Sequence, residues 1–259
     1  MGRTLLQTIR ITAGCQLAAA CESSDSSSLG LDSGRLTGSE PSGICIDDQV
    51  GACFHHSQVV IDFSVPQATL GYLEWAEKTA TPMVIGTTGL DRAIRERLQQ
   101  VASRVAIVQA PNFSIGVNLM LNLAEQAARV LGEDFDVEII EAHHRHKIDA
   151  PSGTALRLGE AVAAVLGRSL ESDAIYGRQG MTGARPPGSI GFATVRGGTI
   201  VGDHTLLFAG EGERLEITHR AASRTTFAQG AVRAAQWVVS RAPGLYDMQD
   251  VLGLRINNG

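Results

Sequence analysis

The chain has 259 residues, 44% of them hydrophobic, which is enough for one large or two modest domains with buried cores. Its formal net charge of −5 excludes a general nucleic-acid-binding surface, because the lysines and arginines are dispersed and form no basic stripe. No apolar run approaches the ~20 residues that span a bilayer, so we expect a cytoplasmic protein with no membrane and no nucleic-acid partner.

The first half of the chain alternates predicted helices with β-branched strands. Leu5, Leu6 and Ile9 share one face of a predicted helix over 2–12. A short buried strand over 16–22 and an irregular Ser/Gly-rich loop over 23–42 follow. Beyond them, the predicted strands are 59–63, 83–86 and 105–108, and the predicted helices are 68–78 and 91–101. This alternation favours an α/β, Rossmann-like, doubly wound parallel sheet.

The second half of the chain has a different pattern. The predicted helices are 117–131, 155–166 and 227–240, and the predicted strands are 137–142, 189–196, 199–209 and 213–220. Glycines at 197–198 and at 210–212 separate the last three strands and predict hairpins. We therefore expect an α+β domain with a largely antiparallel sheet.

The cysteines all lie in the first fifth of the chain, at Cys15, Cys21, Cys45 and Cys53. None has C-x-x-C spacing, so we expect reduced thiols, as is usual for a cytosolic protein. The small residues before two of them imitate the cleavage site of an exported lipoprotein. However, Gln7 and Arg10 interrupt the apolar region that such a signal needs.

The segment 141–154 is the most informative stretch, because three histidines, a lysine and an arginine precede a Pro-Ser-Gly-Thr helix start. A solvated polar loop is one interpretation. A metal site is another: His144 and His146 would share a strand face with Asp149 nearby, or His143 would join them in a metal-dependent hydrolase. Adjacent Lys and Arg charges disfavour a metal ion, so we expect none.

The third interpretation is an anion-binding site that transfers protons. Lys147 supplies a positive charge, and Ser152 can cap the following helix. The backbone N–H groups of Gly153 and Thr154 would then face a carboxylate, and the missing side chain at 153 would let it approach closely. This arrangement suits a small di- or polycarboxylate.

Weaker signals point to a dinucleotide. Glu22, at the end of a predicted strand, fits the acid that accepts ribose hydroxyls. The loops 86–89 and 110–114 follow successive strands, so both would face one crevice at the carboxyl edge of the sheet.

These residues closely resemble the 4-hydroxy-tetrahydrodipicolinate reductase (dihydrodipicolinate reductase) family. The resemblance covers essentially the whole chain and is carried by the segments 86–89, 141–155, 191–196, 213–219 and 244–248. It implies an oxidoreductase of lysine biosynthesis through diaminopimelate, in which NADPH or NADH reduces a cyclic dicarboxylate. It also implies a homotetramer, with a discontinuous cofactor domain over 1–114 and 225–259 and a substrate and tetramerisation domain over 115–224.

The resemblance also implies roles for individual residues. His143 would be the proton donor and acceptor, and Lys147 the proton donor. The substrate would be held by His144, Ser152, Gly153 and Thr154. The cofactor would be held by Met1, Glu22, Gly86, Thr87, Thr88, Ala110, Pro111, Asn112 and Phe113.

Two features depart from the family pattern. The first strand and nearly all of its glycine-rich turn are absent before Met1, which leaves two interpretations: an internal methionine of a longer protein, or a truncated homologue with impaired cofactor binding. In addition, Ser23 stands where some members carry an arginine that meets the 2′-phosphate of NADPH. We therefore expect a weaker preference for NADPH.

Overall fold

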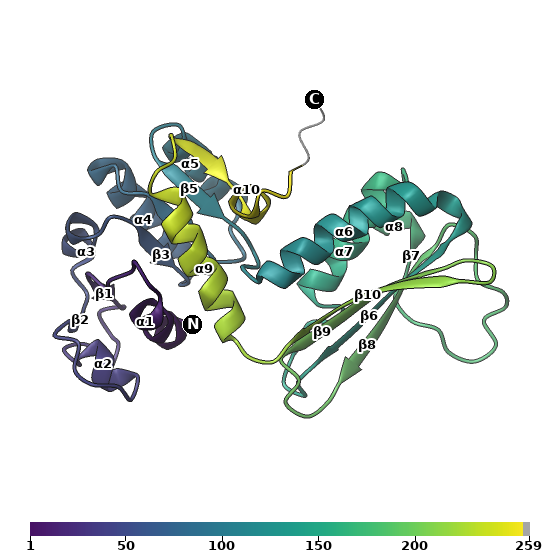
Figure 1. The fold of residues 1–259 in the computed structure, drawn as a ribbon, viewed down its shortest axis with the longest axis horizontal. Helices are drawn as coiled ribbons and strands as arrows, with labels where there is room; N and C mark the ends of the chain where they lie inside the picture. The colour runs from purple at the N-terminus through teal and green to yellow at the C-terminus, as the bar shows by residue number, and fades with distance from the viewer. Residues whose placement is uncertain (256–259) are drawn as a thin grey trace. The chain divides into compact units, whose positions relative to one another are not determined.

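The computed structural model describes residues 1–255, and the chain forms two compact units (Figure 1). Unit 1 comprises residues 1–115 and the chain from Arg224 onward, and unit 2 comprises residues 116–223. Among the described residues, no helix is both long and apolar enough to span a bilayer.

Unit 1 is a parallel α/β structure. Its helices are α1 (Gly2–Ile11), α2 (Ser33–Leu36), α3 (Val50–His56), α4 (Pro66–Thr79), α5 (Arg92–Ala102), α9 (Thr225–Val238) and α10 (Met248–Leu252). Its strands are β1 (Ala20–Cys21), β2 (Ile46–Asp47), β3 (Val60–Asp62), β4 (Met83–Ile85), β5 (Ala106–Gln109) and β11 (Gly244–Tyr246). All the pairings between these strands are parallel, so the predicted α/β class is confirmed.

Helices cover both faces of the sheet because the buried strands are apolar at every position. In β4, Val84 packs into a cluster with α1 and α9, whereas Met83 and Ile85 pack on the other side with α4 and α5. Successive side chains of a strand point to opposite faces, so an uninterrupted apolar run needs a helical layer on each side. In the first of these layers α1 lies beside α9 (Figure 1).

The sheet of unit 1 is divided by a gap. One part has the order β11-β5-β4-β3 and the other is the pair β1-β2. Among the described strands, β3 pairs only with β4 and β1 only with β2, so each has one edge without a partner strand. Residues of both strands line a cavity of about 1460 Å³.

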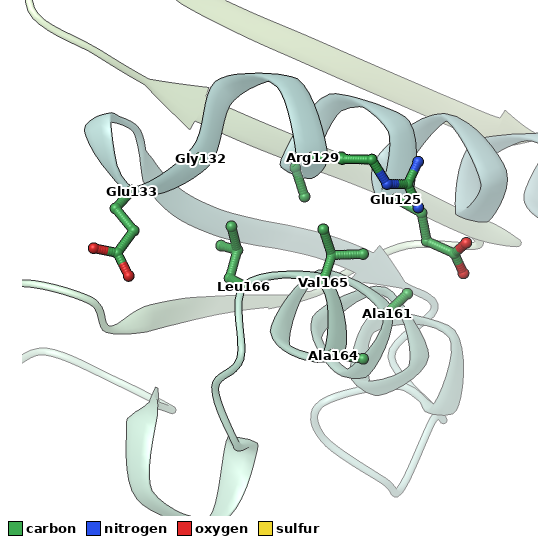
Figure 2. A pocket seen from close by; sticks show the side chains of 9 residues that line it. Glu125, Arg129, Gly132, Glu133, Ala161, Ala164, Val165 and Leu166 are labelled. Atoms are coloured by element: carbon green, nitrogen blue, oxygen red, sulfur yellow. The ribbon is translucent and has the colours of Figure 1, made fainter.

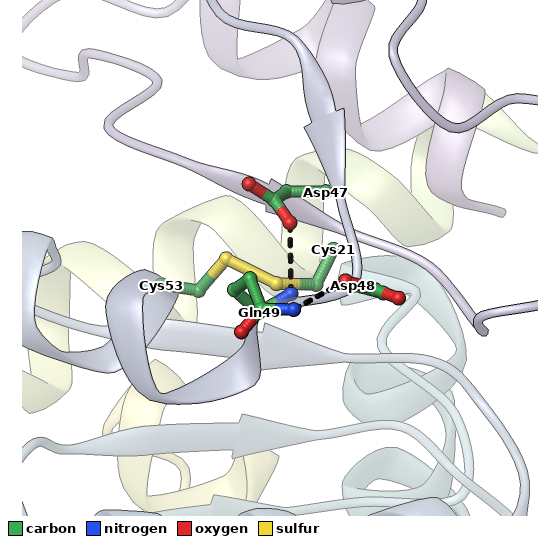
Figure 3. The surroundings of a disulfide bond; sticks show 5 residues. All are labelled: Cys21, Asp47, Asp48, Gln49 and Cys53. Atoms are coloured by element: carbon green, nitrogen blue, oxygen red, sulfur yellow. Dashed lines mark hydrogen bonds between the residues drawn. A yellow bond between two sulfur atoms is a disulfide. The ribbon is translucent and has the colours of Figure 1, made fainter.

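A disulfide joins Cys21 to Cys53, so the prediction that all cysteines are reduced is wrong for this pair (Figure 3). The bond links the end of β1 to α3, with a Cα–Cα distance of 6.8 Å. Nearby, Asp47 Oδ1 accepts a hydrogen bond from Gln49 N at 2.9 Å and helps to turn the chain into α3 (Figure 3). The sequence spacing does not reveal the pair, because the two cysteines are 32 residues apart. Cys15 and Cys45 are free thiols.

Two local predictions near the start of the chain also need correction. The strand predicted over 16–22 is shortened to β1, and the loop predicted over 23–42 contains α2. The carboxylate of Asp32 organises that loop by accepting hydrogen bonds from the backbone N–H groups of Gly34, Arg35, Ser42 and Gly43. These bonds, led by that of Ser42, lower the pKa of Asp32 to about 2.

Unit 2 places helices against one mixed sheet. Its helices are α6 (Ile115–Leu131), the short η1 (Gly132–Asp134), α7 (Gly153–Val165) and α8 (Leu170–Asp173). Its strands are β6 (Asp136–His143), β7 (Ala174–Ile175), β8 (Ile190–Arg196), β9 (Gly202–Ala209) and β10 (Arg214–Ala221), in the order β10-β9-β6-β8-β7.

The sheet of unit 2 is mixed rather than largely antiparallel. β6 is antiparallel to β9 but parallel to β8. The glycines at 210–212 do form the predicted hairpin between β9 and β10. The hairpin predicted at 197–198 is wrong, because β6 lies between β8 and β9. A turn signal shows that the chain reverses but not which strand becomes its neighbour.

The close packing of α9 in unit 1 generates a stability prediction. A Cβ at Gly230 would overlap the carbonyl oxygen of Phe113, whereas a Cβ at Gly71, in α4, would meet nothing within 4 Å. We expect Gly230→Ala to lower the free energy of unfolding by more than about 2 kcal/mol, through overpacking against backbone. Gly71→Ala should raise it by up to about 1 kcal/mol, because alanine is the better helix former. Urea denaturation of both variants measures the difference, and equal stabilities would contradict the packing.

Candidate active site

The segment singled out in the sequence forms one compact site in unit 2. β6 ends at His143, α7 begins at Gly153, and the loop 144–152 connects them. The loop is anchored to the neighbouring β8–β9 connection, since Gly197 N donates to His143 O at 3.0 Å and Arg145 N donates to Gly198 O at 3.4 Å. The predicted proton-transfer and substrate residues of unit 2 are thus brought together by one strand end, one loop and one helix start.

A buried carboxylate, Glu141, lies at the base of this site. Its side chain is 1% exposed and accepts two hydrogen bonds from the guanidinium of Arg196, at 2.8 Å each. It also contacts His143 Nδ1 at 2.6 Å and accepts from the backbone N of Ser152 at 3.1 Å. Residues 141 and 143 share a face of β6 because strand side chains alternate.

The protonation state of His143 follows from these neighbours. Burial lowers the pKa of His143, and the positive charges of Lys147 and Arg196 lower it further, while Glu141 acts to raise it. Burial alone would raise the pKa of Glu141, but hydrogen bonds from Arg196 and His143 bring it below its usual value. An ionised carboxylate only accepts, so the neutral imidazole carries its proton on Nδ1 and leaves Nε2 with a lone pair.

A second histidine, His204 of β9, packs edge-on against His143 with ring centroids 5.1 Å apart. Its Nε2 lies 2.9 Å from Ser152 Oγ, and that hydroxyl caps α7 by accepting from Ala155 N at 3.2 Å. Burial, together with the neighbouring His143, lowers the pKa of His204 to about 4, so it is neutral at physiological pH. Gly202 leaves room beside this pair, since a Cβ there would come within 3.0 Å of His143 Nε2.

The ammonium of Lys147 is paired with Asp149, at 2.7 and 2.8 Å from its two carboxylate oxygens. The Lys147 side chain is only 19% exposed, whereas that of Asp149 is 56% exposed. The rings of His144 and His146 have centroids 6.3 Å apart. Among residues 1–255, no group of three His, Cys, Asp or Glu side chains is placed to hold a metal ion.

The start of α7 provides the anion-binding end of the site. Gly153 is exposed, and a Cβ built there would meet nothing within 4 Å, so protein packing does not require glycine at this position. Gly153 and Thr154 form the first turn of a 13-residue helix, where the N–H groups and the helix dipole favour a negative charge.

The residues predicted to bind the cofactor lie in unit 1. Glu22 directly follows β1, is exposed, and lines the 1460 Å³ cavity together with Gly2, which follows Met1 at the start of α1. The loops after β4 and β5 lie together at the carboxyl edge of the sheet, because these parallel strands are neighbours. Among the residues of those loops predicted to bind the cofactor, Thr88 and Pro111 are exposed, and Gly86 and Asn112 are half-buried.

The remaining members of these loops are structural in this conformation. Thr87 is buried, and its hydroxyl accepts a hydrogen bond from Ser64 N at 3.0 Å. Ala110 is buried, and Phe113 is buried against Phe63 with ring centroids 5.4 Å apart. Gly86 also serves packing, because a side chain there would overlap the ring of Phe63.

A separate pocket of about 650 Å³ lies between α6 and α7 (Figure 2). Its lining runs from Ala161 to Leu166 on α7, at the opposite end of that helix from Ser152. Glu125, Arg129 and Glu133 contribute charged side chains to it (Figure 2). None of the predicted site residues lines this pocket.

Comparison with known proteins identifies the family. Residues 1–113 match the family model described as dihydrodipicolinate reductase, N-terminus, and residues 116–252 match that of the C-terminus. The chain belongs to the dihydrodipicolinate reductase family.

Individual members of the dihydrodipicolinate reductase family cover nearly the whole chain. The 4-hydroxy-tetrahydrodipicolinate reductase of Thiobacillus denitrificans is 59% identical over 255 residues, which is 98% of this chain and 95% of that protein. The enzyme of Magnetococcus marinus is 53% identical over the same shares. A dipicolinate-bound dihydrodipicolinate reductase from Paenisporosarcina superposes with a TM-score of 0.76 at 25% identity, covering 96% of this chain and 94% of that one.

The motif of this reductase family predicted the loop but missed three of the residues that support it: Glu141, Arg196 and His204. The sequence did contain a signal for Glu141, because an acid two residues before His143 on a strand lies on the same face as that histidine. No local signal identifies Arg196 or His204. They reach the site because β8 and β9 flank β6.

The buried His204 generates a prediction about pH. Its folded pKa of about 4 lies below the ordinary value of about 6.5, so between these values the unfolded chain binds a proton that the folded chain does not. The contribution of neutral His204 to the free energy of unfolding is therefore complete above pH 6.5 and is lost as the pH falls. The loss between pH 7 and 5 is about 2 kcal/mol. Urea denaturation at both values should show a shallower pH dependence for His204→Gln. The exposed His146→Gln is the control, and equal slopes for the two variants would contradict the assignment.

Proposed function

We propose that this chain reduces 4-hydroxy-tetrahydrodipicolinate to tetrahydrodipicolinate, with NADH or NADPH as hydride donor. The observation that carries the proposal is the convergence, in one loop, of His143, Lys147 and the N-terminus of α7. A cyclic dicarboxylate needs a site for its negative charge and a source of protons, and this loop supplies both.

Each group has a distinct role in the proposed reaction. The N–H groups of Gly153 and Thr154 bind a substrate carboxylate, with His144 beside them. Lys147 donates the proton that accompanies reduction, because a lysine can release its proton whereas the guanidinium of Arg145 keeps its own. His143 exchanges a proton at Nε2, which Gly202 has no side chain to crowd and Glu141 leaves unprotonated.

The cofactor supplies hydride when bound, and the residues of unit 1 fit it in part. Glu22 is placed at the end of β1 for the ribose hydroxyls, and α1 presents its N-terminus at Gly2. Ser23, next to Glu22, brings a hydroxyl but no positive charge, so we propose that NADH competes well with NADPH. We further propose a homotetrameric assembly and a cytoplasmic location, as the family resemblance implies.

One observation favours a second candidate: a homologue with impaired cofactor binding and little or no activity. Residues of β1 and β3 line the cavity, and each strand has one edge without a partner among the described strands. In a dinucleotide-binding fold, the sheet at this place is continuous and leads into the turn whose backbone N–H groups meet the pyrophosphate.

We expect Lys147→Ala to lower kcat by 10²- to 10⁴-fold, which is the usual contribution of general acid catalysis. The dissociation constant for NADH should change less than twofold, because Lys147 belongs to unit 2. Steady-state kinetics with saturating substrate and a fluorescence titration with NADH measure the two effects. Lys78→Ala, at the exposed end of α4, is the matched control. An unchanged kcat in Lys147→Ala would refute the proton-donor role.

The gap in the sheet generates a prediction about cofactor affinity. An N-terminal extension encoding an apolar strand and a glycine-rich turn should pair with β1 and β3 and lower the dissociation constant for NADH at least 10-fold. This corresponds to about 1.4 kcal/mol. An extension of equal length with prolines in the strand, which cannot donate ladder hydrogen bonds, is the control. The prediction fails if the 259-residue chain already binds NADH as tightly as the extended one.

A further inference from the structure

We propose that Glu141, held by Arg196, is a positioning residue that fixes the tautomer of His143 and ties it to the start of α7. The inference rests on the proposed reductase function. Neither residue touches the place where a substrate would bind in this proposal, since both act through the groups they hold.

The first step concerns the carboxylate itself. Glu141 is almost fully buried, and each of its oxygens is used. Oε2 meets His143 Nδ1 and one guanidinium nitrogen, while Oε1 meets the other guanidinium nitrogen, Ser152 N and Thr194 Oγ1. A charge removed from water this completely is retained only if its partners hold it firmly, so Glu141 has one orientation.

The second step concerns the span of the loop. Arg196 also donates to the carbonyl oxygen of Asp149 at 2.7 Å. The Glu141–Arg196 pair therefore holds His143 before the loop, Asp149 within it, and Ser152 at its end. Lys147 lies between these anchors and is itself paired with Asp149. One ion pair thereby fixes how far His143 and Lys147 lie from the N-terminus of α7.

The third step concerns the imidazole. With an anionic acceptor at Nδ1, the neutral ring keeps its proton there and exposes a lone pair at Nε2. A glutamine at 141 could donate its amide N–H to Nδ1, which would move the ring proton to Nε2. Proton exchange at Nε2 would then begin from the wrong form, although the hydrogen bond survives.

Glu141→Gln should therefore lower kcat at least 30-fold while the KM for the dicarboxylate changes less than threefold. The ¹⁵N shifts of His143 at pH 8 should show the proton on Nε2, whereas the parent protein shows it on Nδ1. The remaining charged and titratable groups around the ring, which are Lys147, Arg196 and His204, are unchanged in the variant. The limb of the pH profile assigned to His143 should move to lower pH, because the carboxylate that raises its pKa is gone.

The matched control is Glu138→Gln on the same strand. Glu138 also pairs with arginines, at 2.7 Å from Arg178 and 3.1 Å from Arg185, but touches neither His143 nor the loop. The Glu138→Gln variant should be less stable than the parent protein but keep its kcat within twofold. Arg196→Lys tests the anchor separately: it keeps the charge but loses the paired donors, so kcat should fall between threefold and 10-fold with the proton still on Nδ1.

Two results would overturn the inference: a loss of kcat in Glu141→Gln no greater than in Glu138→Gln, or a ring proton that stays on Nδ1. If Glu141→Gln does not fold, a kcat of Arg196→Lys equal to that of the parent protein would also overturn the inference. The ¹⁵N measurement needs no substrate, so it tests the positioning role even if the parent protein fails to reduce the dicarboxylate, a failure that would refute the proposed function instead.

Discussion

The ion pair between Glu141 and Arg196 is the interaction on which the candidate site of unit 2 depends. A buried carboxylate costs several kcal/mol in lost hydration, and removal of one partner leaves the other charge uncompensated. The protein offsets this cost by giving the carboxylate hydrogen-bond partners from β6, β8 and the start of α7. The parallel pairing of β8 with β6 places Arg196 level with His143, within reach of Glu141 on the same strand.

Unit 1 depends on a different constraint, the pairing of strand edges. β3 and β1 are short and present unpaired edges toward the same cavity. The Cys21–Cys53 disulfide fastens β1 to α3, and the hydrogen bond from Glu22 N to Asp47 O extends the pairing of β1 with β2. The pair therefore keeps its place beside the cavity with little help from sheet hydrogen bonds. An unpaired edge remains a site for strand addition, so these two edges matter more for unit 1 than any single side chain.

Local sequence patterns predicted most of the longer helices and strands, but they did not predict which distant segments become neighbours. Apolar runs and caps placed α4, α5, α7 and β4 within a few residues, and the His-rich motif located the site. The shortened β1 and the order of β8 and β9 depend on which strands become neighbours, and no local signal states that. The cofactor role predicted for Phe113 stays a prediction, and the structure adds that its ring packs against Phe63, a contact between segments 50 residues apart that no local pattern announces.

The two ion pairs of the site differ in the exposure of their carboxylates, which separates a structural ion pair from one that a ligand can displace. In the Glu141–Arg196 pair the carboxylate is 1% exposed and all its hydrogen bonds are made within the protein, so removing the positive charge of Arg196 would leave Glu141 uncompensated away from water. In the Lys147–Asp149 pair the carboxylate is 56% exposed, so Asp149 keeps much of its hydration. In the proposed reaction, an incoming dicarboxylate would replace Asp149 as the partner of Lys147, and the released aspartate would be rehydrated. The same exchange would bring the ammonium onto the substrate, so binding the anion and placing the proposed proton donor would become one event.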